Sequence, residues 1–181
     1  MIRTAQKYSF QKRQNLKKDG FTLIELLVVI ALIIIIALTA FIVINPLELQ
    51  KQGRDSVRVA DLTAINQAIQ SAVSEASGSA SYPLCDGAAG ACSGDSTQAN
   101  ARLNNGTGWV KVNMSNTSLK MPALKLDPSN TGSLKYQYAT DGTDWELNAQ
   151  LESNKYQGNM SNDGGNSATQ YEVGTKLDLL N

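Results

Sequence analysis

The sequence predicts an α+β protein in which one long N-terminal helix precedes a small head with antiparallel strands. Three observations lead to this prediction. Residues 21–44 are apolar apart from one acid, and residues 45–77 carry apolar side chains at three- and four-residue steps. Residues 134–151 alternate between apolar and polar side chains around an Asp-Gly pair. The first two patterns are typical of helices and the third is typical of a β-hairpin.

Charge divides the chain at residue 20. Residues 1–20 hold six of the 16 Lys and Arg residues and one of the 16 acids, so residues 21–181 hold ten bases and fifteen acids. The first segment is therefore +5 and the remainder is −5. Residues 78–181 carry seven bases against ten acids. We expect no direct, strong nucleic-acid binding by this part, because such binding needs a basic surface.

Several classes of active site are excluded by composition. The chain has no histidine, which removes His-dependent catalytic triads and His-ligated metal sites. Its two cysteines cannot form a four-thiolate site, and the sequence contains no phosphate-binding P-loop motif. No constellation of catalytic residues remains, so we expect a protein that is not an enzyme.

Residues 21–44 are long enough to cross a membrane. As a helix these 24 residues would extend about 36 Å, whereas the core of a bilayer is about 30 Å thick. The run is too long for the apolar core of an ordinary secretory signal peptide. The six preceding bases predict that its N-terminal end stays in the cytoplasm and that the chain from about Leu47 onward lies outside.

One acid, Glu25, lies a single turn inside this apolar run. A charge there is costly unless it has a partner or lies close enough to the interface to reach water. Residues 17–25, with the sequence KKDGFTLIE, closely resemble the processing site of type IV pilins and the related pseudopilins. The resemblance implies that a prepilin peptidase cuts between Gly20 and Phe21, that the Phe21 amine is methylated, and that Glu25 governs assembly. Asp19 departs from the family, where a base is more usual.

The resemblance also implies a domain organisation and a location. Residues 1–20 would be a cytoplasmic leader, 21–44 a transmembrane and filament-core helix, 45–77 its amphipathic continuation, and 78–181 a globular head. The implied fold is the pilin fold, a long helix packed on a small antiparallel sheet. The subunit would cross the inner or cytoplasmic membrane once, with its head outside the cytoplasm. The pilus assembly machinery would then build it into a homo-oligomeric helical filament, as an extracellular pilus or an envelope-spanning pseudopilus.

The long helix is expected to continue from Phe21 to Ser77. Pro46 removes one backbone hydrogen bond and crowds the preceding turn, so a kink or a loosened turn is expected there. The family also has a proline near this point. Beyond it, one apolar stripe faces a core, made of Val59, Leu62, Ile65, Ile69, Val73 and Ala76. Most polar side chains fall between these positions, among them Arg54, Asp55, Arg58 and Asp61.

The head is expected to contain one disulfide and a few short elements. Cys85 and Cys92 would pair in an oxidising location outside the cytoplasm, the alternative being two free thiols. A brief helix is expected at residues 97–104, and a last strand at residues 171–177. Two strands at residues 134–139 and 143–151 would form a hairpin. The residues expected to pack are Tyr136, Tyr138, Trp145, Leu147 and Leu151.

Two signals in the head have alternative explanations. Asp127-Pro128, followed by Tyr136 and Tyr138, resembles a pattern before the hairpin of major pseudopilins and several pilins, but it could also be a simple turn. Asp163, in the polar loop at residues 162–166, could offer an oxygen ligand to Ca²⁺, although such a loop is more often only a turn. No other cofactor is expected.

Three functions are consistent with the sequence. The first is a structural subunit of a type IV pilus. The second is a pseudopilin of a type II secretion or DNA-uptake machine. The third is a membrane-tethered enzyme or receptor that uses residues 21–44 only as an anchor, which would leave Glu25 and the Gly20–Phe21 junction unexplained.

Overall fold

A computed structural model of the chain describes residues 20–76, 83–85 and 90–180, apart from the side chains of residues 42–44. These residues belong to two compact units, with the boundary between Ile44 and Asn45. Residues 1–19 of the expected leader (1–20) and the expected helix end at Ser77 lie outside the described residues.

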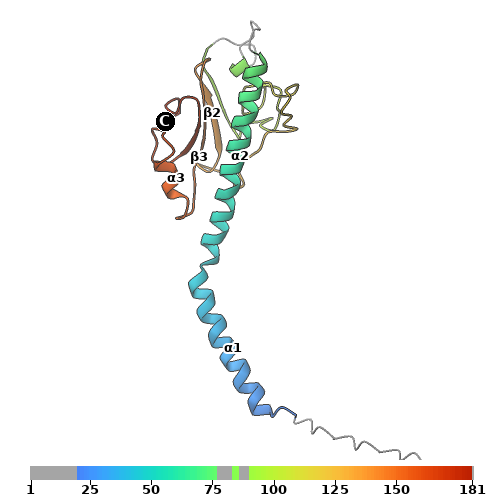
Figure 1. Cartoon of the computed structure of the whole chain (residues 1–181), viewed down its shortest axis with the longest axis vertical. Coiled ribbons are helices and arrows are strands. Elements are labelled where there is room, and N and C mark those ends of the chain that lie inside the picture. Colours follow the sequence, from blue (N-terminus) through green and yellow to red (C-terminus); the bar gives the residue numbers. More distant parts are fainter. Residues whose placement is uncertain (1–19, 77–82, 86–89, 181) are drawn as a thin grey trace, which may run out of the picture. The chain divides into compact units, whose positions relative to one another are not determined.

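The described residues of the first unit contain one helix, α1 (Leu23–Ile44) (Figure 1). Its segment Leu23–Phe41 is long and apolar enough to cross a membrane and is not buried within the protein. A helix that is apolar on all sides requires an apolar environment around it. The helix expected at residues 21–44 is confirmed, although it begins at Leu23.

A break between two helices replaces the continuous, kinked helix expected around Pro46. The second helix, α2 (Pro46–Ala76), starts directly after Asn45, whose φ of +41° is in the left-handed region. The Asn45 carbonyl accepts from the Glu48 N–H at 3.1 Å and the Leu49 N–H at 3.3 Å, and its side-chain oxygen accepts from the Glu48 N–H at 3.3 Å. Asn45 therefore caps α2, and Pro46 occupies the first helical position, where its missing N–H costs nothing.

The second unit is built on a four-stranded antiparallel sheet with the strand order β1-β2-β3-β4. The strands are β1 (Cys92–Asp95), β2 (Tyr136–Thr140), β3 (Trp145–Ala149) and β4 (Tyr171–Gly174). Strands β2 and β3 form the expected hairpin, with Thr140 opposite Trp145 and Gly142 at a φ of +99° in the turn. The last strand is confirmed, although it ends at Gly174. Strand β1 was not predicted, because its sequence CSGD has no apolar alternation.

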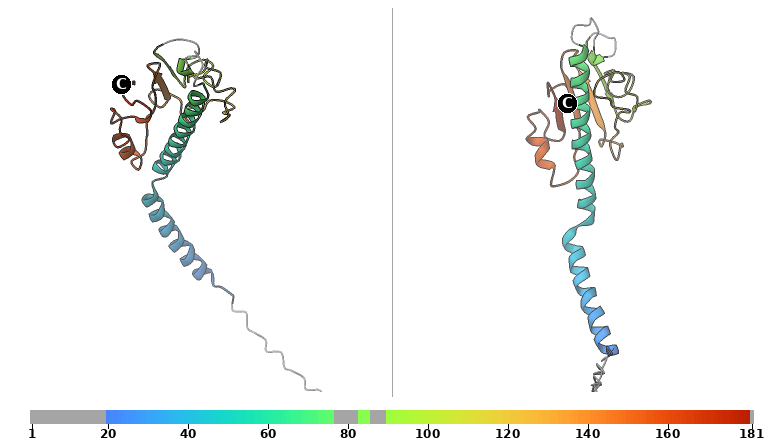
Figure 2. Two further views of the ribbon diagram at one scale, coloured as in Figure 1. Left: turned by 45° about the horizontal axis from the view of Figure 1, so that its top comes forward. Right: turned by 45° about the vertical axis from the view of Figure 1, so that its right-hand side comes forward.

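Helix α2 lies along this sheet (Figures 1 and 2) and contacts β3 and β4. The predicted stripe faces the core, since Leu62, Ile65 and Ile69 are fully buried. The five head residues that were expected to pack are also buried, namely Tyr136, Tyr138, Trp145, Leu147 and Leu151. The helix and the sheet therefore share one core.

Residues 96–135, between β1 and β2, fold without a regular helix or strand. The brief helix expected at residues 97–104 is wrong, because this segment forms successive turns and Asn100 has a left-handed φ of +63°. The segment is nevertheless anchored in the core by Trp109, which is fully buried. The indole N–H of Trp109 donates to the Lys125 carbonyl at 2.9 Å, and its ring lies 5.8 Å from that of Tyr136. A short helix that was not predicted, α3 (Gln157–Ser161), follows β3.

Candidate assembly site

The predicted cleavage junction lies directly before α1. Gly20, Phe21 and Thr22 are exposed and non-helical, and the Phe21 side chain is 88% exposed. Exposed, non-helical backbone is the preferred site of proteolytic cleavage, and the described residues on both sides of the Gly20–Phe21 bond are exposed and non-helical.

Glu25 is held in place by Thr22 at the first turn of α1. Its Oε2 accepts from the Thr22 N–H at 2.9 Å and from the Thr22 hydroxyl at 2.8 Å. The Thr22 hydroxyl oxygen in turn accepts from the Glu25 N–H at 3.3 Å. This reciprocal arrangement is a capping box, which satisfies donors that the start of a helix leaves unpaired. The role of Thr22 was not predicted. Its signal in the sequence is the spacing Thr-x-x-Glu between Thr22 and Glu25, which is typical of a capping box.

Glu25 is also the only charged residue of α1. The helix otherwise presents apolar side chains that are about half exposed or more, from Leu23 to Phe41. The polar group of Thr39 is satisfied within the helix, because its hydroxyl donates to the Ile36 carbonyl at 2.8 Å. Helix α1 therefore offers one fixed anionic group, one turn from the Gly20–Phe21 junction, and an apolar surface over its remaining length.

The second unit contains a buried charge cluster that the sequence analysis missed. Arg58 and Asp55 were expected on the polar face of α2, yet both side chains are fully buried. The Arg58 guanidinium donates from Nη1 to Asp55 Oδ1 at 2.8 Å and to Glu152 Oε1 at 2.6 Å. Its Nε and Nη2 donate to the two oxygens of Asp127 at 2.6 and 2.9 Å. One cation therefore holds three carboxylates from separate parts of the chain.

Asp127 of the Asp-Pro pair forms a turn, which is one of the two explanations that the sequence left open. Its Oδ1 accepts from the N–H groups of Ser129 at 2.7 Å and Asn130 at 3.1 Å, as in an Asx-type turn. The same carboxylate forms the bidentate pair with Arg58. The turn therefore positions an acid that anchors this loop to α2.

Interactions within the cluster favour the charged forms of Arg58 and Glu152. Burial by itself would lower the pKa of Arg58, but hydrogen bonds from Arg58 to Asp127 and Glu152 outweigh it and raise the pKa further above its ordinary range. The hydrogen bond from Arg54, followed by those from Arg58, lowers the pKa of Glu152 to about 2. Charge-assisted bidentate bonds of this kind are among the strongest that proteins form.

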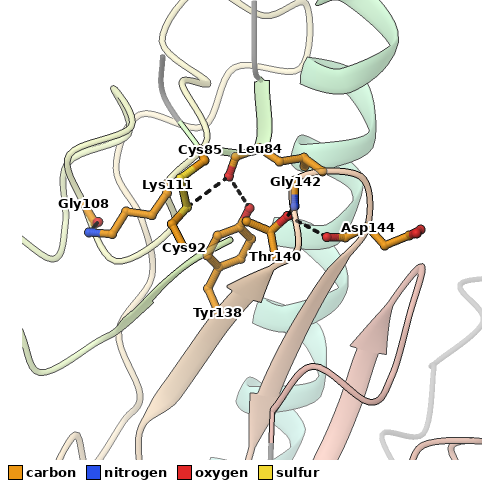
Figure 3. The surroundings of a disulfide bond; sticks show 9 residues. All are labelled: Leu84, Cys85, Cys92, Gly108, Lys111, Tyr138, Thr140, Gly142 and Asp144. Atoms are coloured by element: carbon orange, nitrogen blue, oxygen red, sulfur yellow. Dashed lines mark hydrogen bonds between the residues drawn. A yellow bond between two sulfur atoms is a disulfide. The ribbon is translucent and has the colours of Figure 1, made fainter. Parts of the chain in front are cut away.

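A disulfide joins Cys85 and Cys92, as the sequence predicted. It connects the short 3₁₀ helix η1 (Pro83–Cys85) to the start of β1 (Figure 3). Beside it, the Tyr138 hydroxyl donates to the Leu84 carbonyl at 2.6 Å. Strand β2 and the disulfide therefore both hold η1 against the sheet.

Asp163, the calcium candidate, uses both carboxylate oxygens in bonds to the backbone. Oδ1 accepts from the Gly165 N–H at 3.0 Å, and Oδ2 accepts from the Glu172 N–H at 2.8 Å. Within the described part of the chain, no group of three or more Cys, Asp or Glu side chains is arranged to hold a metal ion. Calcium binding at Asp163 stays a prediction.

Comparison with known protein families gives a match at the N-terminal segment. Residues 15–41 match the model described as the prokaryotic N-terminal methylation motif. The matched residues include Gly20, Phe21 and Glu25, together with most of α1. No curated protein and no solved structure matches the chain.

Proposed function

From the methylation motif at residues 15–41, which is the hallmark of type IV pilin and pseudopilin prepilins, we propose that this chain is a structural subunit of a type IV pilus-like filament. The prepilin is inserted in the cytoplasmic membrane through α1. A prepilin peptidase cuts it after Gly20 and methylates the Phe21 amine. The assembly machinery then polymerises the subunit through its N-terminal helix.

One observation carries this proposal. The only charge on an otherwise apolar, exposed helix is Glu25, and it is fixed by Thr22 one turn from the processed end. An acid in an apolar helix is expected to have a cationic partner. Cleavage creates such a partner, because it leaves a positively charged amine on Phe21.

The proposed role of Glu25 is to set the axial register between subunits. Two opposite charges about 4 Å apart attract by roughly 4 kcal/mol at an effective dielectric constant of 20. If α1 packs beside identical helices with an axial stagger, the amine of an incoming subunit meets Glu25 of one already in place. An uncut leader would bring five net positive charges to the same position, so cleavage must precede assembly.

The test is the substitution Glu25→Leu in the full chain, expressed in cells with the assembly machinery. We expect the variant to be cleaved and inserted in the membrane but absent from filaments. The matched control is Thr39→Val, which removes a polar group of α1 that bonds only within the helix and should assemble normally. In the wild type, mass spectrometry of filaments should show a subunit that begins at methyl-Phe21. Normal filament yield from Glu25→Leu would contradict the proposal.

A pseudopilin of a type II secretion or DNA-uptake machine is the second candidate. Its support in the sequence is Asp127-Pro128, which precedes Tyr136 and Tyr138 in a pattern that resembles major pseudopilins and several pilins. The Asp127 carboxylate is buried in an ion pair with Arg58. The location of the filament separates the two candidates. Shear-released surface filaments indicate a pilus, and envelope-confined, shear-resistant filaments indicate a pseudopilus.

A further inference from the structure

Three polar side chains are buried on the face of the sheet that points away from α2. Glu146 and Asn148 of β3 alternate with the apolar residues of that strand, which belong to the core shared with α2. Because successive side chains of a strand point to opposite faces, Glu146 and Asn148 lie on the other face of the sheet. Glu172 of β4 pairs directly with Asn148, so its side chain lies on that face too. The exposed fractions of Glu146, Asn148 and Glu172 are 0%, 2% and 2%, and we call these three residues the outer-face site.

Two segments of the backbone cover the outer-face site. In the loop before β4, the Ser167 N–H donates to Glu172 Oε2 at 3.0 Å. In the C-terminal segment, the N–H groups of Leu179 and Leu180 donate to Glu146 Oε2 at 2.6 and 2.9 Å. Backbone donors therefore satisfy one oxygen of each carboxyl group.

The other oxygens of the outer-face site have no donor. Within the described part of the chain, Glu146 Oε1, Asn148 Oδ1 and Glu172 Oε1 are buried and have no hydrogen-bond partner. Among the same residues, neither glutamate forms an ion pair with a lysine or an arginine. A buried carboxylate is costly unless it is paired, hydrogen-bonded or bound to a metal ion, and two neighbouring carboxylates also repel each other. The three free oxygens therefore require a positively charged partner.

We propose that the outer-face site binds a divalent cation, held by Glu146 Oε1, Asn148 Oδ1 and Glu172 Oε1. Carboxylate and amide oxygens are ligands that Ca²⁺ and Mg²⁺ prefer, and both ions also accept water as a ligand. The cation neutralises the two carboxylates and satisfies all three free oxygens. It also fixes the loop before β4 and the C-terminal segment on the sheet, because these segments bond to the same two carboxyl groups. The site goes beyond the proposed function, since it concerns the folded head and not filament assembly.

The outer-face site differs from the loop at residues 162–166 that the sequence indicated. Asp163 in that loop uses both carboxylate oxygens in bonds to backbone N–H groups, whereas the outer-face site has three oxygens without a donor. It consists of two acids and one amide, and its residues come together only because β3 pairs with β4. No local motif in the sequence could have indicated it.

A proton is the alternative partner of the outer-face site when no divalent cation is present. Burial, followed by the hydrogen bond and the charge of Glu146, raises the pKa of Glu172 to about 7. A proton on Glu172 neutralises one of the two carboxylates, but it leaves Asn148 Oδ1 without a partner. Protons and the cation therefore compete, and the cation should bind more tightly at pH 8 than at pH 6.

Thermal unfolding of the full chain in detergent micelles at pH 8 tests the site, first in EDTA and then with CaCl₂ or MgCl₂. At about a hundredfold its dissociation constant, the cation should raise the Tm of the wild type by roughly 5–10 °C. Glu172→Gln keeps the shape of the side chain without its charge and should lose most of this shift. The control Asp178→Asn removes an exposed acid of the C-terminal segment and should keep it. If neither cation raised the Tm of the wild type, or if Glu172→Gln kept the full shift, the proposal would be overturned.

A second pair of measurements locates the cation. Asp163→Asn should keep the shift in Tm, because Asp163 supplies none of the free oxygens. Loss of the shift in Asp163→Asn but not in Glu172→Gln would place the cation in the loop and contradict the proposal. Hydrogen exchange reports on the site directly, since Glu146 Oε2 binds the Leu179 and Leu180 amides. CaCl₂ should slow the exchange of both amides in the wild type and not in Glu172→Gln, and unchanged exchange in the wild type would also count against the proposal.

Discussion

Arg58 on α2 and Asp127 in the loop before β2 form a fully buried bidentate ion pair, with distances of 2.6 Å from Nε to Oδ2 and 2.9 Å from Nη2 to Oδ1. The two residues are 69 positions apart in the sequence. Arg58 also holds Asp55 and Glu152. This single cation therefore ties the helix to two separate loops of the head.

Removal of Arg58 should be the most damaging single substitution in the cluster. Arg58→Leu leaves Asp55, Asp127 and Glu152 without their shared cation, and breaking a buried pair in this way costs about 3–5 kcal/mol. Arg54→Leu is the control, because the Arg54 side chain is 33% exposed and bonds only Glu152 within the cluster. Urea denaturation of the full chain in detergent micelles measures the loss in free energy of unfolding for both variants. A smaller loss from Arg58→Leu than from Arg54→Leu would contradict this assignment.

The β2–β3 hairpin could be predicted from the sequence, whereas the buried charge cluster around Arg58 could not. Residues 136–149 alternate locally around Asp141-Gly142, so both strands and their turn were predictable. Arg58 directly precedes the apolar stripe of α2, which begins at Val59, but its burial depends on Asp127, which comes close only after folding. Strand β1 was missed for the same reason, because its extended conformation depends on pairing with β2. At the assembly site, residues 17–25 predicted Gly20, Phe21 and Glu25, whereas the hydrogen bonds of Thr22 became visible only in the structure.

Acid should weaken the cluster through Glu152. Arg54 first, then Arg58, lower the pKa of Glu152 to about 2 from an ordinary value of 4.5. A carboxyl group with a lowered folded-state pKa stabilises the protein above pH 4.5, and this contribution is lost as the pH falls toward 2. Because the Glu152 carboxylate is partly exposed, we expect it to contribute about 1–2 kcal/mol to the free energy of unfolding at neutral pH. Glu152→Gln should therefore lower the free energy of unfolding at pH 7, and the deficit should vanish near pH 2. A deficit that is constant with pH would exclude this explanation.

Glu172 should produce the opposite pH dependence. Burial, together with the neighbouring carboxyl groups of Glu146 and Asp163, raises the pKa of Glu172 to about 7. Glu146 is itself fully buried, and its Oε2 accepts a hydrogen bond from the Leu179 N–H at 2.6 Å. Because the folded state retains a proton that the unfolded state loses above pH 4.5, stability falls as the pH rises from 4.5 to 7.

Glu172→Gln tests this dependence. The neutral amide mimics the protonated carboxyl group, so the variant should be more stable than the wild type at pH 8, by up to about 3 kcal/mol. At pH 4 the two proteins should differ little. Thermal unfolding across this pH range measures the effect, and Gln157→Glu, at an exposed position of α3, controls for net charge. A wild-type stability that does not change between pH 5 and pH 7 would refute the prediction.

The Cys85–Cys92 disulfide should stabilise the head through the short loop that it closes. Because the two cysteines are seven positions apart in the sequence, the chain-entropy model gives a stabilisation of about 2–3 kcal/mol. The double substitution Cys85→Ser with Cys92→Ser avoids a lone thiol and should lower the free energy of unfolding by this amount. Tyr138→Phe is the companion variant, because it removes only the hydrogen bond to Leu84 and should cost about 1 kcal/mol. Equal stability of the double variant and the wild type would show that the disulfide is dispensable.

Asn45 should be more sensitive to substitution than its exposed position suggests. It combines a left-handed φ of +41° with a side-chain cap on the Glu48 N–H. Asn45→Gly keeps the backbone conformation and loses only the side-chain cap, which costs a few tenths of a kcal/mol. Asn45→Leu loses the cap and adds a left-handed penalty, each about 1 kcal/mol. The free energy of unfolding of the full chain in micelles should therefore be highest for the wild type, lower for Asn45→Gly and lowest for Asn45→Leu. If Asn45→Leu were the most stable, residue 45 would have to be helical, and the chain would form the continuous helix that the sequence alone predicted.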